Sequence, residues 1–229
     1  MKLAVMQPYL FPYIGYFQLI HAADLFLIYD DVTYIKQGYI NRNSIRSTNG
    51  VKRFTVPVPG ASSNRLISEL AFSKDVTKVL KTIEQSYSKA PYFENVFPII
   101  HEILEFKDRS IASVCQKSFN DIFSYLCIER QIRKTSDLEY DRTANPRDRL
   151  ISLCRKCGAD CYINAPGGRK LYEKKDFAEQ GISLKFLDSL PMRYSKADAN
   201  FVANLSIVDV LMHCSASTIK DSLDQYELN

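Results

Sequence analysis

Apolar and polar positions follow one another along the chain in blocks that predict strands and helices in turn. Residues 2–6, "KLAVM", and 24–32, "DLFLIYDDV", are apolar runs of the length of a buried strand. Residues 15–23 between them place apolar side chains at helical spacing. The stretch from Gln7 to Pro12 is expected to be a loop, because each proline lacks a backbone donor and fixes φ. A strand, loop, helix and strand within about 30 residues predict a βαβ unit.

The middle of the chain changes its pattern. Asn49-Gly50 between "NSIRST" and "VKRFTVPV" is a strong hairpin signal, which predicts a β-hairpin over residues 40–58, after the second strand. After a loop at 59–65, apolar residues recur at spacings of three and four, as at Val76, Val79 and Leu80. We interpret this part as a helical insertion over about 75–128, with helices within 75–88, 92–106 and 110–128.

The last third returns to alternating elements. Residues 145–159 predict a helix with Asn145 as N-cap and Pro146 in the first turn. Short strands are expected within 130–138, at 161–165 and at 182–188, with a loop and helix before the last of these and a closing helix over 205–226. No repeat or linker interrupts the pattern. The prediction is therefore a single α/β domain over residues 1–229, with a mostly parallel sheet flanked by helices.

Charge and composition narrow the function classes. The 229 residues carry a formal net charge of +4, with a pI near 8.6. This mild charge lacks the dense basic footprint of a nucleic-acid binder, and the basic stretch "NRNSIR" is not interleaved with aromatic residues. No apolar run approaches the roughly 20 residues that span a bilayer, and the first residues lack a signal-peptide pattern. We expect a cytoplasmic protein with no nucleic-acid partner and no membrane insertion; a homo-oligomer remains compatible with the sequence.

Three cysteines cluster in "CRKCGADC", at Cys154, Cys157 and Cys161. Thiols of a cytosolic protein are expected to be reduced. A structural zinc site needs four ligands, usually including a second close pair, and the other cysteines are scattered. We therefore assign no metal ligands, although the sequence does not decide whether these three bind a metal. It also carries no signature for coenzyme A or ATP, so the cofactor stays unknown.

Candidate binding residues follow the first predicted strand. Ligands of open α/β sheets collect beyond the carboxyl ends of the strands. There, Gln7 offers an amide, and Gly15 lies where a helix N-terminus exposes N–H groups to an anion. Tyr9, Tyr13 and Tyr16 can stack on a base or a sugar and still offer hydroxyls. The alternative is that some of these tyrosines merely cover the sheet edge.

The second predicted strand ends in paired carboxylates, Asp30 and Asp31. Buried charges are costly unless they are paired or used, and adjacent strand residues point to opposite faces. One of the two is therefore a candidate general base, and the other would pair with a neighbouring cation. The predicted ligand-binding residues downstream are Lys36, Asn41, Arg42 and Asn43, among which arginine suits phosphate or carboxylate.

A third candidate site is "INAPGGRKLY". A strand followed by Pro-Gly-Gly and a helix is the layout of a phosphate-binding turn, which makes Gly167 and Gly168 ligand-binding candidates. Arg169 at the helix start opposes the helix dipole, so we expect it to face the ligand. A plain turn explains the same residues. His21, at the end of the first helix, is a candidate base or a helix C-cap.

Several motifs together resemble those of the WbqC-like protein family. They are "MQPYLFPYIGYFQLI", "DLFLIYDDVTYIKQGYINRN", "YINAPGGRKLY" and "LSIVDVLMH", and they cover nearly the whole chain. The family commonly continues its last helix into a Gly-Pro turn, where this chain has "CSASTIKDSL". The resemblance implies a bacterial protein encoded among genes for O-antigen (lipopolysaccharide) and other surface polysaccharides. It also implies transfer of an amino acid, such as glycine, to an amino sugar.

Two functions compete at this point. The first is a transferase that forms an amide on a nucleotide-linked amino sugar, with Asp30, Asp31 or His21 taking the proton from the amine. The second is a non-catalytic protein of the same pathway that binds a sugar or a partner enzyme. Whether the protein is an enzyme stays open on the sequence alone.

Overall fold

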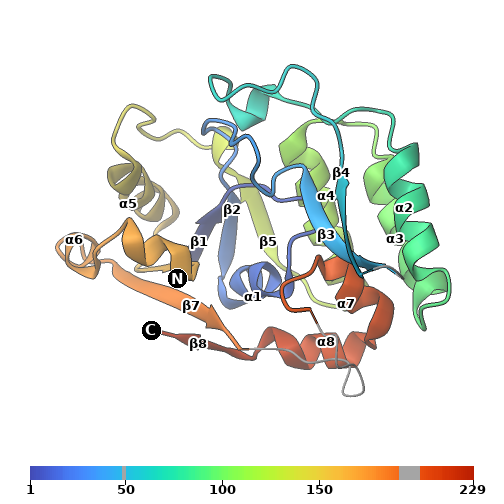
Figure 1. Cartoon of the computed structure of the whole chain (residues 1–229). Coiled ribbons are helices and arrows are strands. Elements are labelled where there is room, and N and C mark those ends of the chain that lie inside the picture. Colours follow the sequence, from blue (N-terminus) through green and yellow to red (C-terminus); the bar gives the residue numbers. More distant parts are fainter. Residues whose placement is uncertain (48–49, 191–201) are drawn as a thin grey trace.

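A six-stranded sheet forms the centre of the computed structural model, which describes residues 1–47, 50–190 and 202–229 (Figure 1). Its strand order is β5-β2-β1-β6-β7-β8, and neighbouring strands are parallel except β7 and β8. The strands are β1 (Lys2–Met6), β2 (Leu25–Ile28), β5 (Gln131–Lys134), β6 (Cys161–Asn164), β7 (Ser183–Ser189) and β8 (Tyr226–Leu228). The mostly parallel α/β fold predicted from the sequence is confirmed.

The strand order reverses direction between β1 and β6. From β1 the chain continues outward to β2 and β5, whereas β6 returns to the other side of β1 and is followed outward by β7 and β8. The two strands pair directly, with Ala4 opposite Ile163. Loops leaving the carboxyl ends of such neighbours diverge to opposite faces, which opens a crevice at this edge of the sheet.

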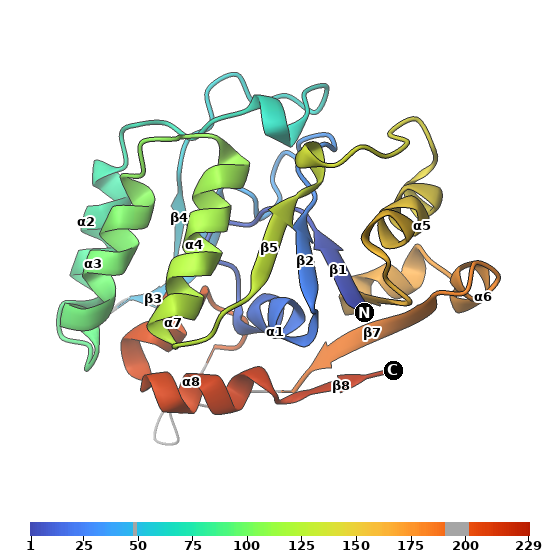
Figure 2. The same cartoon turned by 180° about the vertical axis from the view of Figure 1, so that it is seen from behind.

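Helices cover both faces of the sheet because its strands alternate between two apolar clusters (Figure 2). Ala4 and Phe26 belong to one cluster, and Leu3 and Leu25 belong to the other. The first cluster includes residues of α1 (Ile14–Ala22), α4 (Ile111–Tyr125), α7 (Ile207–His213) and α8 (Ala216–Leu223). The second includes residues of α5 (Pro146–Cys157) and α6 (Lys174–Ala178).

A separate two-stranded hairpin stands beside the sheet, as predicted. It consists of β3 (Arg42–Ser47) and β4 (Gly50–Thr55), which pair antiparallel with Ser47 opposite Gly50. Asn49 of the predicted turn lies outside the described residues. The inserted helices α2 (Thr77–Tyr87) and α3 (Phe93–Leu104) lie at the side of the hairpin and α4 (Figure 1). Their apolar residues belong to the same cluster as those of α1.

Local capping explains several element boundaries. Asn145 begins α5, since its side-chain oxygen accepts a hydrogen bond from the Asp148 N–H at 3.0 Å, as predicted. Gly158 ends the same helix in the left-handed region, with φ 69°. Short 3₁₀ helices complete the chain: η1 (Ile67–Glu69), η2 (Thr135–Asp137) and η3 (Pro166–Lys170).

Two predicted boundaries were wrong. The closing helix is broken at Cys214, whose backbone is extended, and the Ser215 hydroxyl starts α8 by accepting a hydrogen bond from the Thr218 N–H at 3.1 Å. The pattern continues through the break because both helices bury apolar residues in the same cluster. The second strand ends at Ile28. The Asp30 N–H donates a hydrogen bond to the Ile28 carbonyl at 3.0 Å, which turns the chain out of the strand. The carboxylates therefore lie in a loop.

Candidate functional site

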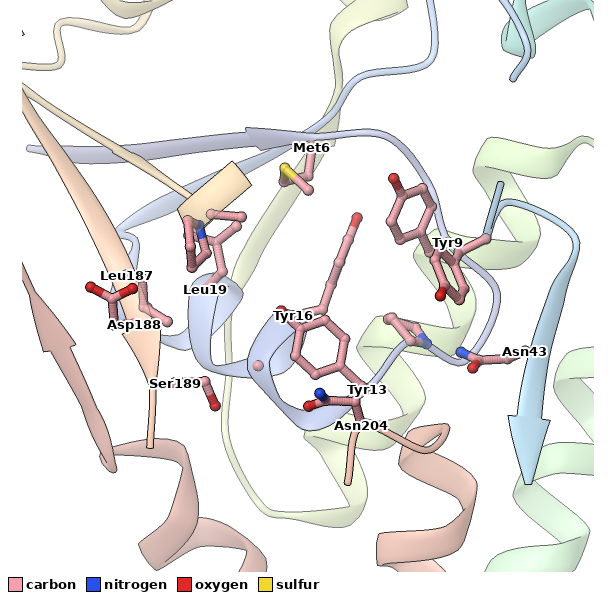
Figure 3. Close-up of a pocket in the computed structure, with 15 residues that line it drawn as sticks. Met6, Tyr9, Tyr13, Tyr16, Leu19, Asn43, Leu187, Asp188, Ser189 and Asn204 are labelled. Atoms are coloured by element: carbon pink, nitrogen blue, oxygen red, sulfur yellow. The ribbon is translucent and has the colours of Figure 1, made fainter. Parts of the chain in front are cut away.

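A cavity of about 500 Å³ lies at the carboxyl edge of the sheet, where the loops that follow β1 and β6 diverge (Figure 3). Its walls come from the end of β1 and the loop after it, from α1, from the turn after β6, and from the end of β7. Aromatic and small polar side chains predominate. The described lining residues are Met6, Tyr9, Pro12, Tyr13, Gly15, Tyr16, Leu19, Tyr39, Asn43, Ala165, Pro166, Leu187, Asp188, Ser189 and Asn204.

The loop between β1 and α1 is hydrogen-bonded to segments that are distant in the sequence. Phe11 has φ 47°, a left-handed conformation that is rare for a bulky residue. Its carbonyl oxygen accepts hydrogen bonds from Asn43 Nδ2 and Ser206 Oγ, each at 2.7 Å. The Leu10 N–H donates to the Ile40 carbonyl at 3.2 Å. The loop is thereby fixed by segments distant in sequence, and Asn43 has a positioning contact besides its place in the lining.

Tyrosine rings form one side of the cavity. The ring of Tyr9 lies 5.6 Å from that of Tyr16 and 6.0 Å from that of Tyr39. The Tyr16 hydroxyl donates to the Gln7 carbonyl at 2.7 Å, so the backbone of Gln7 takes part in the site's support. Burial raises the pKa of Tyr9, Tyr13 and Tyr16, which keeps these phenols protonated as hydrogen-bond donors.

Gly15 is required by the packing of Tyr13. A Cβ atom at Gly15 would overlap the Tyr13 ring, so only glycine lets that ring lie against the start of α1. Tyr13 is the N-cap of α1 and makes no side-chain capping hydrogen bond. Both residues line the cavity. The structure thus brings the predicted residues Tyr9, Tyr13, Gly15 and Tyr16 together at the cavity. Their ligand-binding role stays a prediction.

The opposite side of the cavity carries a carboxylate at Asp188. Its Oδ1 accepts from Arg169 Nη1 at 2.8 Å, and its Oδ2 accepts from Arg169 Nη2 and from Asn229 Nδ2, the latter at 2.8 Å. Arg169, followed by Asn229, lowers the pKa of Asp188 to about 2. The guanidinium of Arg169 also lies over the Phe186 ring at 5.1 Å. Arg169, predicted to face the ligand, thus pairs with a residue of the lining.

Asp30 and Asp31 do not line the cavity. Both are buried, and both bind the segment that follows β5. Asp31 Oδ1 accepts from Thr135 Oγ1 at 2.6 Å, and its Oδ2 receives Arg142 Nε at 2.7 Å. Asp30 Oδ2 accepts from Ser136 Oγ at 2.7 Å. These contacts tie the ends of β2 and β5 together, while the catalytic role of the pair stays a prediction.

The other predicted residues lie elsewhere. His21, near the end of α1, faces Arg130 Nη2 at 2.6 Å and Asp224 Oδ1 at 3.2 Å, and burial followed by Arg130 lowers its pKa. Lys36 is exposed. Asn41 Nδ2 donates to the Val56 carbonyl at 2.8 Å, and Arg42 Nε donates to the Gly38 carbonyl at 2.9 Å. Of the cluster predicted after the second strand, the structure brings Asn43 to the cavity.

The predicted phosphate-binding turn is the 3₁₀ helix η3, and its glycines differ. A Cβ at Gly168 would overlap the side chain of Asn164 and come within 3.3 Å of the Phe186 ring. A Cβ at Gly167 would meet no atom of the described residues within 4 Å. Gly168 therefore serves close packing, whereas Gly167 has no packing reason to be glycine.

No group of three or more His, Cys, Asp or Glu side chains is arranged to hold a metal ion within 1–47, 50–190 and 202–229. Cys154 is buried, and burial raises its pKa to about 12; Cys157 and Cys161 are partly buried, and burial raises the pKa of each. Over the same described ranges, no helix is both long and apolar enough to cross a membrane.

Sequence reasoning missed part of the lining. Tyr39 lies within the predicted segment "YDDVTYIKQGYINRN" but was not singled out. Asp188 and Ser189 end β7, and the general expectation for carboxyl ends of parallel strands could have found them. Asn204 has φ 60° and no sequence pattern marked it.

The fold and the cavity define an open α/β protein with a ligand-sized crevice at its topological switch point. Comparison with known sequences is more specific. The model of the WbqC-like protein family matches residues 7–221, so the chain belongs to this family. The chain is also 30% identical over 220 residues to "Uncharacterized protein Rv1507c" of Mycobacterium tuberculosis (strain ATCC 25618 / H37Rv), covering 94% of each protein. No solved structure gives a significant match.

Proposed function

We propose that this protein binds a nucleotide-linked amino sugar in the tyrosine-lined cavity and transfers an aminoacyl or acyl group to the sugar nitrogen. The reaction would be a step in the biosynthesis of a surface polysaccharide such as O-antigen. The pathway is what membership of the WbqC-like family suggests. The composition of the cavity supports the ligand class.

The observation that carries the proposal is the composition and place of the cavity. Its volume of about 500 Å³ falls in the range of small-molecule sites. Tyrosine faces suit a base or the apolar face of a sugar ring, and the protonated hydroxyls of Tyr9 and Tyr13 can donate to sugar oxygens, whereas that of Tyr16 donates to the Gln7 carbonyl. The adjacent start of α1 offers backbone N–H groups to a phosphate, in a helix of 9 residues.

The chemical step is an aminolysis. The unprotonated amine of the sugar attacks the carbonyl carbon of an acyl ester or thioester, forming the C–N bond. The bond from that carbon to the leaving oxygen or sulfur then breaks, and the leaving group keeps the electron pair. The amine loses one proton, which the solvent or a base accepts.

A second candidate, a non-catalytic sugar-binding protein of the same pathway, is favoured by a specific observation. Among the described lining residues, Asp188 is the carboxylate, and its low pKa makes it a weak proton acceptor. The phenols of Tyr9, Tyr13 and Tyr16 have raised pKa values and stay protonated. A protein that only binds its ligand needs no base in this position.

Thermal unfolding with a panel of nucleotide sugars and free nucleotides tests binding. A ligand at 100 times its dissociation constant adds about 2.7 kcal/mol to the unfolding free energy, which shifts the melting temperature measurably. Stabilisation by an amino-sugar nucleotide, weakened in Tyr39→Ala but not in the exposed control Leu171→Ala, supports the proposal. The absence of stabilisation by every nucleotide sugar would contradict it.

Mass spectrometry separates the two candidates. The bound amino-sugar nucleotide is incubated with an acyl thioester, and the sugar is inspected for the mass of the added acyl group. A gain that depends on the protein supports the transferase. Saturable binding without any gain, across aminoacyl and simple acyl donors, favours the sugar-binding protein.

A further inference from the structure

The cavity has two chemically different ends. Figure 3 shows Tyr9 and Asn43 on one side and Asp188 on the opposite side, with Tyr13 and Tyr16 between them. Asp188 is the charged residue among the described residues of the lining. A ligand that fills the cavity therefore meets aromatic surface at one end and the Asp188 carboxylate, paired with Arg169, at the other.

We propose that Asp188 is the specificity-determining residue of this cavity, and that it selects ligands carrying a free amino group over ligands in which that nitrogen is acylated. The inference rests on the proposed function and deepens it, since it names the group of the ligand that is recognised and the residue that recognises it.

The contacts of Asp188 leave room for such a ligand. A carboxylate offers about four acceptor positions. From the described part of the chain, Oδ2 receives Arg169 Nη2 and Asn229 Nδ2, and Oδ1 receives Arg169 Nη1. Within 1–47, 50–190 and 202–229, no donor occupies the second acceptor position of Oδ1, and the Asp188 side chain is 34% exposed.

The neighbours of Asp188 hold it in place and keep it ionised. Arg169 is itself fixed by stacking on Phe186. Asn229 is fixed by its backbone, which exchanges hydrogen bonds with Phe186 at 2.8 and 3.0 Å. The pKa of about 2 means that Asp188 stays an anion throughout the neutral range. Arg169 and Asn229 are therefore positioning residues for a permanently charged acceptor.

An anion in this place discriminates between the two forms of the ligand nitrogen. A protonated amine offers a positive charge and three N–H donors, whereas an acylated nitrogen offers one neutral N–H and additional bulk. Hydrogen bonds with an ionised partner are roughly twice as strong as neutral ones. Before the proposed transfer the bound ammonium loses a proton to the solvent or a base, and the free amine then reacts. Acylation removes the charge, so the same residue that binds the substrate would release its product.

The test compares UDP-glucosamine with UDP-N-acetylglucosamine, which differ only in the acetyl group on nitrogen. Isothermal titration at pH 7 gives the dissociation constant of each for the wild-type protein and for Asp188→Asn. We expect the wild-type protein to prefer the free amine by about tenfold, and Asp188→Asn to lose most of this preference. Binding of the N-acetylated ligand should change little.

Asp176→Asn is the matched control. Asp176 also pairs with an arginine, Arg147, and its side chain is 32% exposed, but it lies outside the cavity. We expect it to leave the preference unchanged. Arg169→Gln should reduce the preference only in part, since it removes a positioning residue and keeps the Asp188 carboxylate. A role for Asp188 in folding alone would lower the melting temperature without changing the ratio of the two dissociation constants.

Three results would overturn the inference. The first is equal binding of both ligands by the wild-type protein. The second is a loss of affinity for both ligands by the same factor in Asp188→Asn. The third is a change of the ratio in Asp176→Asn as large as that in Asp188→Asn. Failure of the proposed function gives a different result, because then neither UDP-sugar nor any other nucleotide sugar binds the wild-type protein.

Discussion

Two groups of polar residues lie at the carboxyl edge of the same sheet, and they are built differently. At the ends of β2 and β5, Asp30 and Asp31 are 1% and 5% exposed, and hydroxyl, amide and guanidinium donors surround their oxygens. At the ends of β1, β6 and β7, tyrosine side chains and the partly exposed carboxylate of Asp188 border a cavity. Saturated buried charges hold strands together, whereas partly satisfied groups beside a cavity are available to a ligand.

The largest expected effect on stability is that of Asp31→Ala. The substitution leaves the Tyr140 hydroxyl without its carboxylate acceptor and removes the Arg142 ion pair. The Thr135 hydroxyl loses its 2.6 Å contact with Asp31 and keeps the 3.1 Å contact with Asp30 Oδ1. We expect the free energy of unfolding in urea to fall by about 3 kcal/mol. Asp188→Asn, at the cavity, should change it far less. A loss of similar size in both variants would contradict the distinction between a structural cluster and a binding site.

Gly168→Ala and Gly167→Ala together distinguish a packing role of the η3 turn from a ligand-binding role. The new Cβ at Gly168 would overlap Asn164, so we expect a loss of about 2 kcal/mol in the unfolding free energy. A Cβ at Gly167 would meet no atom of the described residues within 4 Å, so Gly167→Ala should leave stability nearly unchanged. If Gly167→Ala nevertheless weakens nucleotide binding, the turn contributes to the ligand site as the sequence predicted. Equal destabilisation by both variants would show that packing does not distinguish them.

Tyr39→Ala tests whether a residue of the cavity lining contributes to ligand binding without contributing to stability. Tyr39 is 60% exposed, so its removal should change the unfolding free energy by less than about 0.5 kcal/mol. Loss of a stacking face should weaken nucleotide-sugar binding by about tenfold, measured by titration calorimetry. A loss of stability without loss of affinity would show that Tyr39 has a structural role, as Asp30 and Asp31 do.

The smallest expected effect is the acid dependence of the Asp188–Arg169 pair. The pKa of Asp188 falls from an ordinary value of 3.8 to about 2, chiefly because of Arg169. Its stabilising contribution is therefore complete above about pH 4 and is lost as the pH falls towards 2. The difference in urea midpoint between the wild-type protein and Arg169→Gln should stay constant from pH 7 to 4 and shrink below. A difference that instead changes between pH 7 and 5 would show that another group titrates.

Much of the fold could be predicted because its signals are local. The apolar runs at β1 and β2, the helical spacing in α2 and α4, and the Asn145 cap of α5 each depend on neighbouring residues. The break at Cys214 could not be predicted, because both helices around it follow the same apolar pattern. The strand β8 was also missed, since its three residues are defined only by pairing with β7.

The residues of the candidate site also divide into those that local sequence predicts and those that only the folded sheet brings together. Tyr9, Tyr13, Gly15 and Tyr16 follow one strand and start one helix, so the sequence placed them together. Asp30 and Asp31 were expected at the site because they follow the neighbouring strand. Their actual partners begin more than a hundred positions later in the chain, at Thr135, Ser136 and Arg142. Only the pairing of β2 with β5 brings those donors within reach.

The sequence by itself determined the class of the fold, the family and the aromatic loop at the first strand end, because short-range pattern and composition suffice for each. The tertiary structure decided which polar residues are structural and which border a cavity. Burial and hydrogen-bond saturation depend on segments that meet only in the folded sheet. Asp188 illustrates this: the order of the strands brings it, with its partner Arg169, to the cavity that Tyr9 and Tyr16 line.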